Sequence, residues 1–97
     1  MSVTVTWEFR FSAENAAEGL RLTQEIWKDM QAFSGLIGHE LIQDLDDNGH
    51  LLVISRWTSR EAPDRAKDEY VEHPNRQAVD ALVTEPRRRL VGRAVPQ

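Results

Sequence analysis

Aromatic side chains are the residues of this chain best suited to bind a flat organic molecule. Trp57 ends a run from His50 onward that is rich in Leu, Val and Ile and predicts a strand with Trp57 and Ser55 on one face. An indole on that face could stack on an aromatic ring and donate its N–H group. The alternative, which the sequence leaves open, is that Trp57 only packs in the core at the end of its strand.

Three further aromatic side chains are predicted to point into the same layer. Trp7 belongs to the first predicted strand, and Trp27 and Tyr70 belong to predicted helices. Together they favour an aromatic-lined cavity that binds a substrate. Core packing is the preferred explanation of Trp27, because helical spacing accounts for it fully, and packing is also preferred for Tyr70.

Histidines supply the candidates for proton transfer, since an imidazole titrates near neutral pH. His39 is the preferred general base, because its predicted strand starts close to the end of the first helix. His50 lies beside a predicted turn, where we expect it to be solvated. No histidine pair has the i, i+4 spacing of a helical metal site, and the chain contains no cysteine, so we predict no metal and no thiolate chemistry.

A basic run, Arg87 to Arg89, lies near the end of the chain. Alternate residues of a strand point to opposite faces, so two of the three arginines share one face. We expect them to pair with Asp44 or Asp46 at a sheet edge or a dimer contact, in preference to binding an anion. The sequence contains no nucleophile elbow, phosphate loop or dinucleotide-binding motif.

The periodicity of apolar residues predicts the elements that position these side chains. Apolar residues at every second position indicate a strand, and steps of three and four indicate a helix. The expected strands are residues 3–11, 36–45, 50–57 and 87–95, and the expected helices are residues 12–33, a segment that follows Thr58, and residues 75–83. The order is β-α-β-β-α-β, and the second helix breaks at His73-Pro74 because proline disfavours helical geometry in the residue before it.

Short motifs predict how these elements begin and end. Ser12 is the expected N-cap of the first helix, and Thr58 with Glu61 forms a capping-box pattern before the second. Gly35 is expected in the left-handed conformation that ends a helix. Asn48-Gly49 favours a tight hairpin, because both residues tolerate positive φ.

This order of elements is typical of the ferredoxin-like α+β fold, an antiparallel sheet with its helices on one face. We expect residues 1–97 to form a single domain, because the chain is too short for two. The other face of the sheet carries an apolar and polar mixture that includes Thr4, Thr6, Leu52 and Ile54. A second sheet packed on this face, in a homodimer, is the simplest cover.

Charge and composition limit the expected partners. The chain has 12 basic and 16 acidic residues and a net charge of −4, which disfavours a nucleic acid partner. The sequence contains no run of about 18 apolar residues, so it predicts no membrane span, and we expect no secretory signal. A sequence without cysteine suits a reducing cytoplasm, which is the expected location.

Three segments, in order, resemble the antibiotic-biosynthesis-monooxygenase (ABM) family. Residues 33–41, FSGLIGHEL, are similar to the stretch after the first helix in these domains. Residues 46–57, DDNGHLLVISRW, are similar to the family's hairpin, which typically ends on a tryptophan before a helix cap. Residues 70–74, YVEHP, resemble the break in its second helix. The resemblance covers nearly the whole chain and rests on the order and spacing of these motifs.

The resemblance implies a dimeric α/β barrel with a pocket between the sheet and the helices of each monomer. Studied members oxidise phenols or anthrones to quinones with molecular oxygen as co-substrate and no cofactor. The family often has a glutamate at the position of Ser55, two residues before the tryptophan. The candidate catalytic residues are therefore Trp57, His39 as base, and Ser55, which could hold a water that acts as the base instead.

One branch of the family degrades haem, and the sequence disfavours that activity. The branch uses an asparagine on the first strand and a histidine on the second helix as iron ligand. The first predicted strand here has no asparagine, and no histidine lies near Val79 or Asp80. His73 comes about two turns too early.

The sequence thus predicts a cofactor-independent monooxygenase that oxidises a small aromatic or phenolic molecule with O2. The alternative is a binding or structural module that has the same dimeric barrel without turnover. The loss of the family's glutamate at Ser55 fits this alternative somewhat better.

Overall fold

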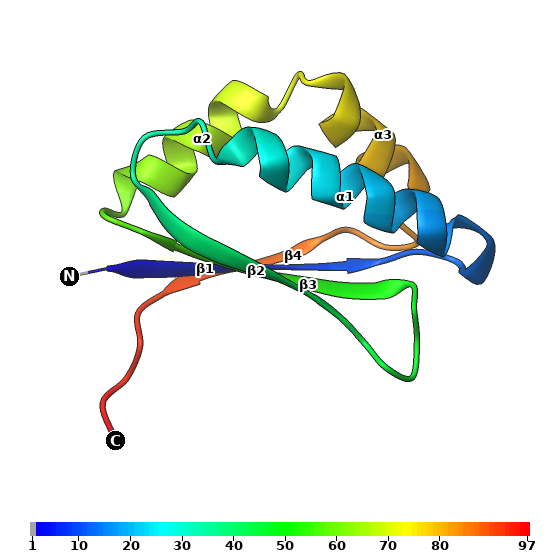
Figure 1. The fold of residues 1–97 in the computed structure, drawn as a ribbon, viewed down its shortest axis with the longest axis horizontal. Coiled ribbons are helices and arrows are strands. Elements are labelled where there is room, and N and C mark those ends of the chain that lie inside the picture. Colours follow the sequence, from blue (N-terminus) through cyan, green and yellow to red (C-terminus); the bar gives the residue numbers. More distant parts are fainter. Residues whose placement is uncertain (1) are drawn as a thin grey trace.

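The computed structural model describes residues 2–97 and has two layers, a sheet and the helices that cover one of its faces (Figure 1). The elements are β1 (Val3–Arg10), the short 3₁₀ helix η1 (Ala13–Asn15), α1 (Ala16–Met30), β2 (Leu36–Gln43), β3 (His50–Trp57), α2 (Glu61–Tyr70), α3 (Pro74–Leu82) and β4 (Arg88–Gly92). The predicted ferredoxin-like α+β order is confirmed. No helix within residues 2–97 is both long and apolar enough to span a bilayer.

The sheet has the strand order β2-β3-β1-β4, and every neighbouring pair is antiparallel. Trp7 on β1 lies opposite Val53 on β3 and opposite Arg89 on β4. Residues directly opposite each other share a face of the sheet, so these three side chains lie together on the helix side. The predicted faces of the first and third strands are therefore confirmed. The last strand is shorter than the predicted residues 87–95.

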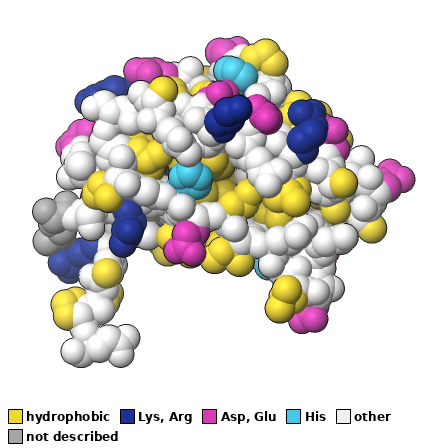
Figure 2. All heavy atoms as spheres, in the orientation of Figure 1, with side chains coloured by type: hydrophobic (Ala, Val, Ile, Leu, Met, Phe, Trp, Pro, Cys, Tyr) yellow, Lys and Arg dark blue, Asp and Glu magenta, His cyan; other side chains and the backbone are white. Residues whose placement is uncertain are grey.

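The core lies between the sheet and the helices. The buried apolar residues are Val5, Phe9, Phe11, Ala16, Leu22, Ile26, Trp27, Met30, Leu51, Val53, Trp57, Ala62, Ala66, Tyr70 and Val79. On α1 they follow steps of three and four residues, as an amphipathic helix requires. Figure 2 shows hydrophobic side chains gathered between the helical layer and the sheet, with charged side chains spread over the helices.

The hydrogen bonds predicted for the N-caps of the first two helices, from Ser12 and Thr58, are absent from residues 2–97. The segment after Ser12 is a 3₁₀ turn, and the buried Oγ of Ser12 has no hydrogen-bond partner within residues 2–97. At α2 the Oγ of Ser59, rather than that of Thr58, accepts from the N–H of Ala62 at 3.3 Å. The helix begins at Glu61, so the predicted capping box is out of register with the first helical turn.

The break between α2 and α3 is confirmed, and His73 has a local role there. Its Nδ1 accepts a hydrogen bond from the N–H of Asn75 at 3.1 Å, and Pro74 occupies the first helical position. Proline suits that position because its missing N–H would have no helical partner. His73 thereby caps α3.

The predicted hairpin is confirmed, because β2 and β3 pair antiparallel on either side of this loop. The expected positive φ at Asn48-Gly49 is wrong; within residues 2–97 only Gly35 has positive φ, at 94°. Asp44 Oδ1 accepts from the N–H of Asp46 at 2.8 Å, and Asp47 Oδ1 accepts from the N–H of Gly49 at 3.0 Å. These side-chain bonds stabilise a wider loop in place of the two-residue turn. The preceding strand accordingly ends at Gln43 rather than at residue 45.

Candidate active site

A cavity of about 40 Å³ lies between the sheet and the helices, and we call it the inner cavity. Its apolar wall includes Val5, Trp7, Phe9, Trp27, Met30 and Trp57. A buried water needs roughly 10–15 Å³ of such space, so the cavity has room for a few waters. An aromatic substrate can enter only if part of the wall moves.

Trp57 and Ser55 both line the inner cavity, and their side chains are hydrogen-bonded to each other. The indole Nε1–H of Trp57 donates to Ser55 Oγ at 2.9 Å, and the Ser55 hydroxyl donates to the carbonyl of Val5 at 3.3 Å. Trp57 is only 2% exposed. The indole therefore offers a ring surface to the cavity, while its N–H is already engaged within the protein.

Trp7, Trp27 and Tyr70 also line the inner cavity, so the structure brings together all the predicted substrate-binding residues. The Tyr70 hydroxyl donates to Asp29 Oδ2 at 2.8 Å, and its ring stacks on that of His73 with centroids 4.3 Å apart. Burial, reinforced by the carboxylate of Asp29, raises the pKa of Tyr70 above its ordinary value. Tyr70 consequently stays protonated and serves as a fixed part of the wall.

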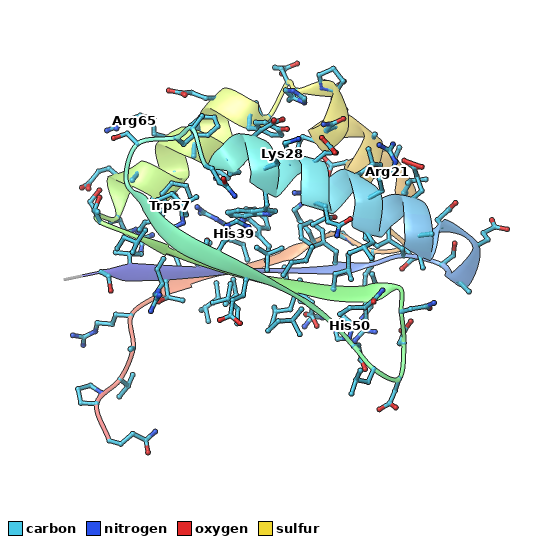
Figure 3. All side chains as sticks on the ribbon, viewed as in Figure 1. Arg21, Lys28, His39, His50, Trp57 and Arg65 are labelled. Carbon is cyan, nitrogen blue, oxygen red and sulfur yellow. The ribbon has the colours of Figure 1, made fainter. Side chains whose placement is uncertain are left out.

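His39 is not among the residues that line the inner cavity. Its ring packs against Trp27, with the two centroids 5.3 Å apart, so Trp27 contacts the imidazole and also lines the cavity. Figure 3 shows His39 in the gap between β2 and α1, on the same side of the sheet as Trp57. In this arrangement the predicted base has no direct access to a bound substrate.

Four cationic side chains line the inner cavity, and sequence reasoning did not place them there: Lys67, Arg76, Arg87 and Arg89. Within residues 2–97 no aspartate, glutamate or histidine lines it. Arg87 and Arg89 share a face as predicted. The pairing of β4 with β1 places Arg89 opposite Trp7, and Arg87, just before β4, lies over the same ring. Their place in the cavity wall therefore follows from the pairing of two strands, which local periodicity does not specify.

The predicted ion pairs of the basic run with Asp44 or Asp46 are wrong. Arg89 Nη2 donates to Asp64 Oδ1 at 2.8 Å. Arg87 pairs with Asp80, which also accepts from Nε of Arg76 at 3.3 Å. These carboxylates lie on α2 and α3, because those helices cover the face of the sheet to which the two arginines point.

The arginines of the wall pack on the aromatic residues. The guanidinium carbons of Arg87 and Arg89 each lie 5.3 Å from the centroid of the Trp7 ring, within the range of a cation–π interaction. That of Arg87 also lies 4.9 Å from the centroid of Phe9. Burial, together with the neighbouring charge of Arg76, lowers the pKa of Arg87 below its ordinary value. The site thus combines cationic side chains with apolar ring surfaces.

A second depression, the outer groove, has a volume of about 650 Å³ and lies against the segment from Val83 to Arg87. It shares four lining residues with the inner cavity: Trp7, Lys67, Arg76 and Arg87. These side chains separate the two spaces. Movement of these side chains would join the two spaces and is the simplest route by which a ligand could enter.

A hydrogen-bonded cluster on the opposite face of the sheet corrects the expectation that His50 is solvated. His50 Nδ1 lies 2.9 Å from Asp44 Oδ2, and Nε2 lies 2.6 Å from Glu8 Oε2. Hydrogen bonding to Asp44 and then to Glu8 raises the pKa of His50, and the bond to His50 lowers the pKa of each carboxyl. Figure 3 shows His50 on the face away from the helices.

This cluster predicts a pH dependence of stability. The raised pKa of His50 contributes stability that is complete below the ordinary value of 6.5 and is lost as pH rises through the folded-state value. The lowered pKa of Glu8 contributes stability that is complete at pH values above its ordinary pKa of 4.5. This contribution is lost as the pH falls through the folded-state pKa. We expect urea unfolding to show a larger free energy at about pH 5.5 than at about pH 8.5.

The variant His50→Gln isolates this effect, because glutamine keeps hydrogen-bonding capacity without titrating. The difference in the free energy of unfolding between the parent and the variant should shrink from about pH 5.5 to about pH 8.5. A difference that stays constant over that range would show that the imidazole charge contributes nothing.

No group of three or more His, Asp and Glu side chains able to hold a metal ion is found in residues 2–97.

Solved structures with the same architecture are known. An antibiotic biosynthesis monooxygenase superposes with a TM-score of 0.86 at 20% identity, over 97% of this chain and 99% of that one. SnoaB, a cofactor-independent oxygenase from Streptomyces nogalater, has a TM-score of 0.86 at 22% identity, over 99% and 95%. Rv0793 from Mycobacterium tuberculosis has a TM-score of 0.75 at 24% identity, over 100% and 98%. At these identities the likeness is one of fold.

No curated protein matches the sequence. The profile of the family "Antibiotic biosynthesis monooxygenase" matches residues 2–70, a segment that extends from β1 to the end of α2 and includes Trp57, Ser55 and His39. That segment is well over half of the chain, and the fold of the remaining residues agrees with the solved structures. The chain therefore belongs to the antibiotic biosynthesis monooxygenase family.

Proposed function

We propose that this protein is a cofactor-independent monooxygenase that oxidises a small phenol-like or anthrone-like molecule with O2. The observation that carries the proposal is the composition of the inner cavity: three indole rings face a wall whose charged groups are all cationic. Indoles suit a flat aromatic ring, and fixed cations suit the anion that forms when such a ring loses a proton. The SnoaB neighbour, a cofactor-independent oxygenase, supports this class of activity.

The proposed reaction needs no strong base in the cavity. A phenol or anthrone bound beside Arg87 and Lys67 has a lowered pKa, because the nearby positive charges favour its anion, and a water can then accept the proton. The anion transfers one electron to O2, and the two radicals combine at the ring carbon to give a peroxide anion. This anion takes back the proton from the water and becomes a hydroperoxide. Loss of water leaves a carbonyl. A CH2 group and O2 thus become C=O and H2O.

Trp57 and Ser55 have a structural part in this proposal. The hydrogen bond between them fixes the plane of the indole against which the substrate stacks. A water that donates to the unused lone pair of Ser55 Oγ is the proposed acceptor of the substrate's proton. His39 acts through Trp27, which it packs against, unless the wall opens far enough for the imidazole to reach the substrate.

We also propose that the protein is a homodimer that covers the open face of its sheet. This face carries Thr4, Thr6, Glu8, Arg10, Ile42, Leu52, Ile54, Arg56, Arg88 and Leu90. Ile42 is 42% exposed and Leu90 is 64% exposed, which leaves apolar surface in water. Figure 1 shows that no helix covers this side and that the C-terminal segment leaves toward it.

A second candidate is a binding module without turnover. It is favoured by one observation: several uncharged polar groups of the cavity wall form hydrogen bonds within the protein itself. Besides Trp57, Ser55 and Tyr70, Thr23 donates from Oγ1 to the carbonyl of Gly19 at 2.7 Å. A wall whose uncharged polar groups already have partners within the protein suits ligand storage as well as chemistry.

Oxygen consumption separates the two candidates. The chelator-treated protein is mixed with a panel of anthrones, naphthols and hydroquinones, and the O2 uptake is compared with the spontaneous rate of each compound. The oxygenase is expected to raise the rate for at least one compound and to place one atom of ¹⁸O2 in the product and the other in water. Binding of the compounds without any increase in uptake would favour the binding module.

A further inference from the structure

The partition between the inner cavity and the outer groove concentrates positive charge in a chain whose net charge is −4. Lys67, Arg76 and Arg87 line both spaces, and Arg89 lines the inner one. Asp64 pairs with Arg89, and Asp80 pairs with Arg76 and Arg87. Glu85 also lines the outer groove but pairs with Arg10, so four cations face three carboxylates. A positive site in an acidic protein is most simply explained by an anionic ligand.

The hydrogen-bonding capacity of these cations is only partly used. Asp80 is shared between Arg76 and Arg87, and Lys67 has no ion pair with any described residue. The Nε of Arg89 is buried and has no hydrogen-bond partner within residues 2–97. A buried donor without a partner is costly, so a ligand that accepts from this group would be favoured.

The cations are also shielded from solvent. The exposed fractions of the side chains are 13% for Arg87, 16% for Arg76 and 19% for Arg89. Removing a guanidinium from water costs free energy unless a counter-charge compensates it. Their carboxylate partners are far more exposed, at 47% for Asp80 and 42% for Asp64, and compensate this cost only in part.

We propose that the ligand of this site is an aromatic carboxylate, bound with its ring in the inner cavity and its carboxylate between Lys67, Arg76 and Arg87. The planar fork of a guanidinium matches the two oxygens of a carboxylate. The adjacent rings of Trp7 and Phe9 provide the apolar surface for the attached ring. The proposal deepens the proposed function by naming its substrate class, although the binding it describes does not require turnover.

A matched pair of ligands tests the proposal by calorimetry on the intact protein. The ligand 1-hydroxy-2-naphthoate carries the carboxylate, and 1-naphthol has the same ring and hydroxyl without it. We expect the carboxylate to bind about tenfold or more tightly, as one charge-assisted contact implies. This advantage should decrease at high salt, whereas the affinity for 1-naphthol should not.

Two substitutions on one helix provide the variant and its control. Lys67→Gln removes a cation of the partition without leaving an acidic partner unpaired, and it should reduce the advantage of the carboxylate by about tenfold. Arg65→Gln removes a charge two residues away on α2; Arg65 does not line the inner cavity, and Figure 3 shows it pointing outward. The control should bind both ligands like the parent.

The outcomes distinguish this proposal from the proposed function. Equal binding of the two ligands, or no binding of either, overturns the aromatic carboxylate even if oxygen uptake is observed with other compounds. Tighter binding of 1-naphthyl phosphate than of 1-hydroxy-2-naphthoate overturns the carboxylate assignment and favours a phosphate ligand. A carboxylate preference that depends on Lys67 supports the proposal even if no compound stimulates oxygen uptake. That combination of results would contradict only the proposed oxygenase activity.

Discussion

The Trp57→Phe variant is expected to lose both stability and most of the oxygenase rate. Phenylalanine cannot donate to Ser55 Oγ, and it leaves a void where the second ring of the indole lies against the buried core. The lost hydrogen bond and the void together should lower the free energy of unfolding by about 2 kcal/mol. A less well fixed stacking surface should reduce kcat/KM for the active compound by roughly tenfold or more. Urea unfolding and oxygen uptake measure the two effects.

Ser55→Ala is the companion variant, since it removes the other half of the same hydrogen bond. If the bond to Ser55 carries part of the effect, the double variant should lose less stability than the sum of the two single variants. Strict additivity in the free energy of unfolding would show that Trp57 acts by ring volume alone. A fully active Trp57→Phe variant would remove Trp57 from the proposed site.

The Gly49→Ala variant is expected to be the most destabilised of the glycine substitutions. A Cβ atom at residue 49 would lie 2.2 Å from the backbone carbonyl oxygen of Phe11, far inside a normal contact. The two segments cannot move apart easily, because the N–H of Phe11 donates to the carbonyl of Gly49 at 2.8 Å. Forced separation of the loop from the end of β1 should cost about 2–3 kcal/mol, measured by urea unfolding.

Gly92→Ala is the matched control, because a Cβ there meets nothing within 4 Å. It should leave the free energy of unfolding within about 0.5 kcal/mol of the parent. Equal losses in the two variants would mean that the effect comes from glycine's flexibility in the unfolded chain and not from the contact with Phe11.

The fold was predictable because its strongest signals are local. Alternation on β1 and three- and four-residue steps on α1 each follow from burying one face of an element. Caps and turns depend instead on competing hydrogen bonds of nearby side chains. Ser59 takes the place of the predicted Thr58 cap, and Asp47 stabilises the hairpin loop without the positive φ expected at Asn48-Gly49.

The candidate site was predictable only in its aromatic part. Trp7 and Trp57 could be assigned to one face from period two alone, and the structure places both in the inner cavity. His39 was expected there as well, but it lies on an edge strand, where its ring packs against Trp27 and does not line the cavity. Distances between side chains on different elements cannot be read from the spacing of residues along the chain.

Local periodicity and motifs in a fixed order were sufficient to specify the order of the elements, the helix-facing residues of the central strands and the family. The placement of Arg87 and Arg89 over Trp7, and of His50 between Glu8 and Asp44, follows instead from the packing of the folded chain. Glu8 and His50 are separated by 42 positions in the chain. Such groups interact only after strands pair, and Coulomb and hydrogen-bond energies depend on the resulting distances, which strand pairing alone sets.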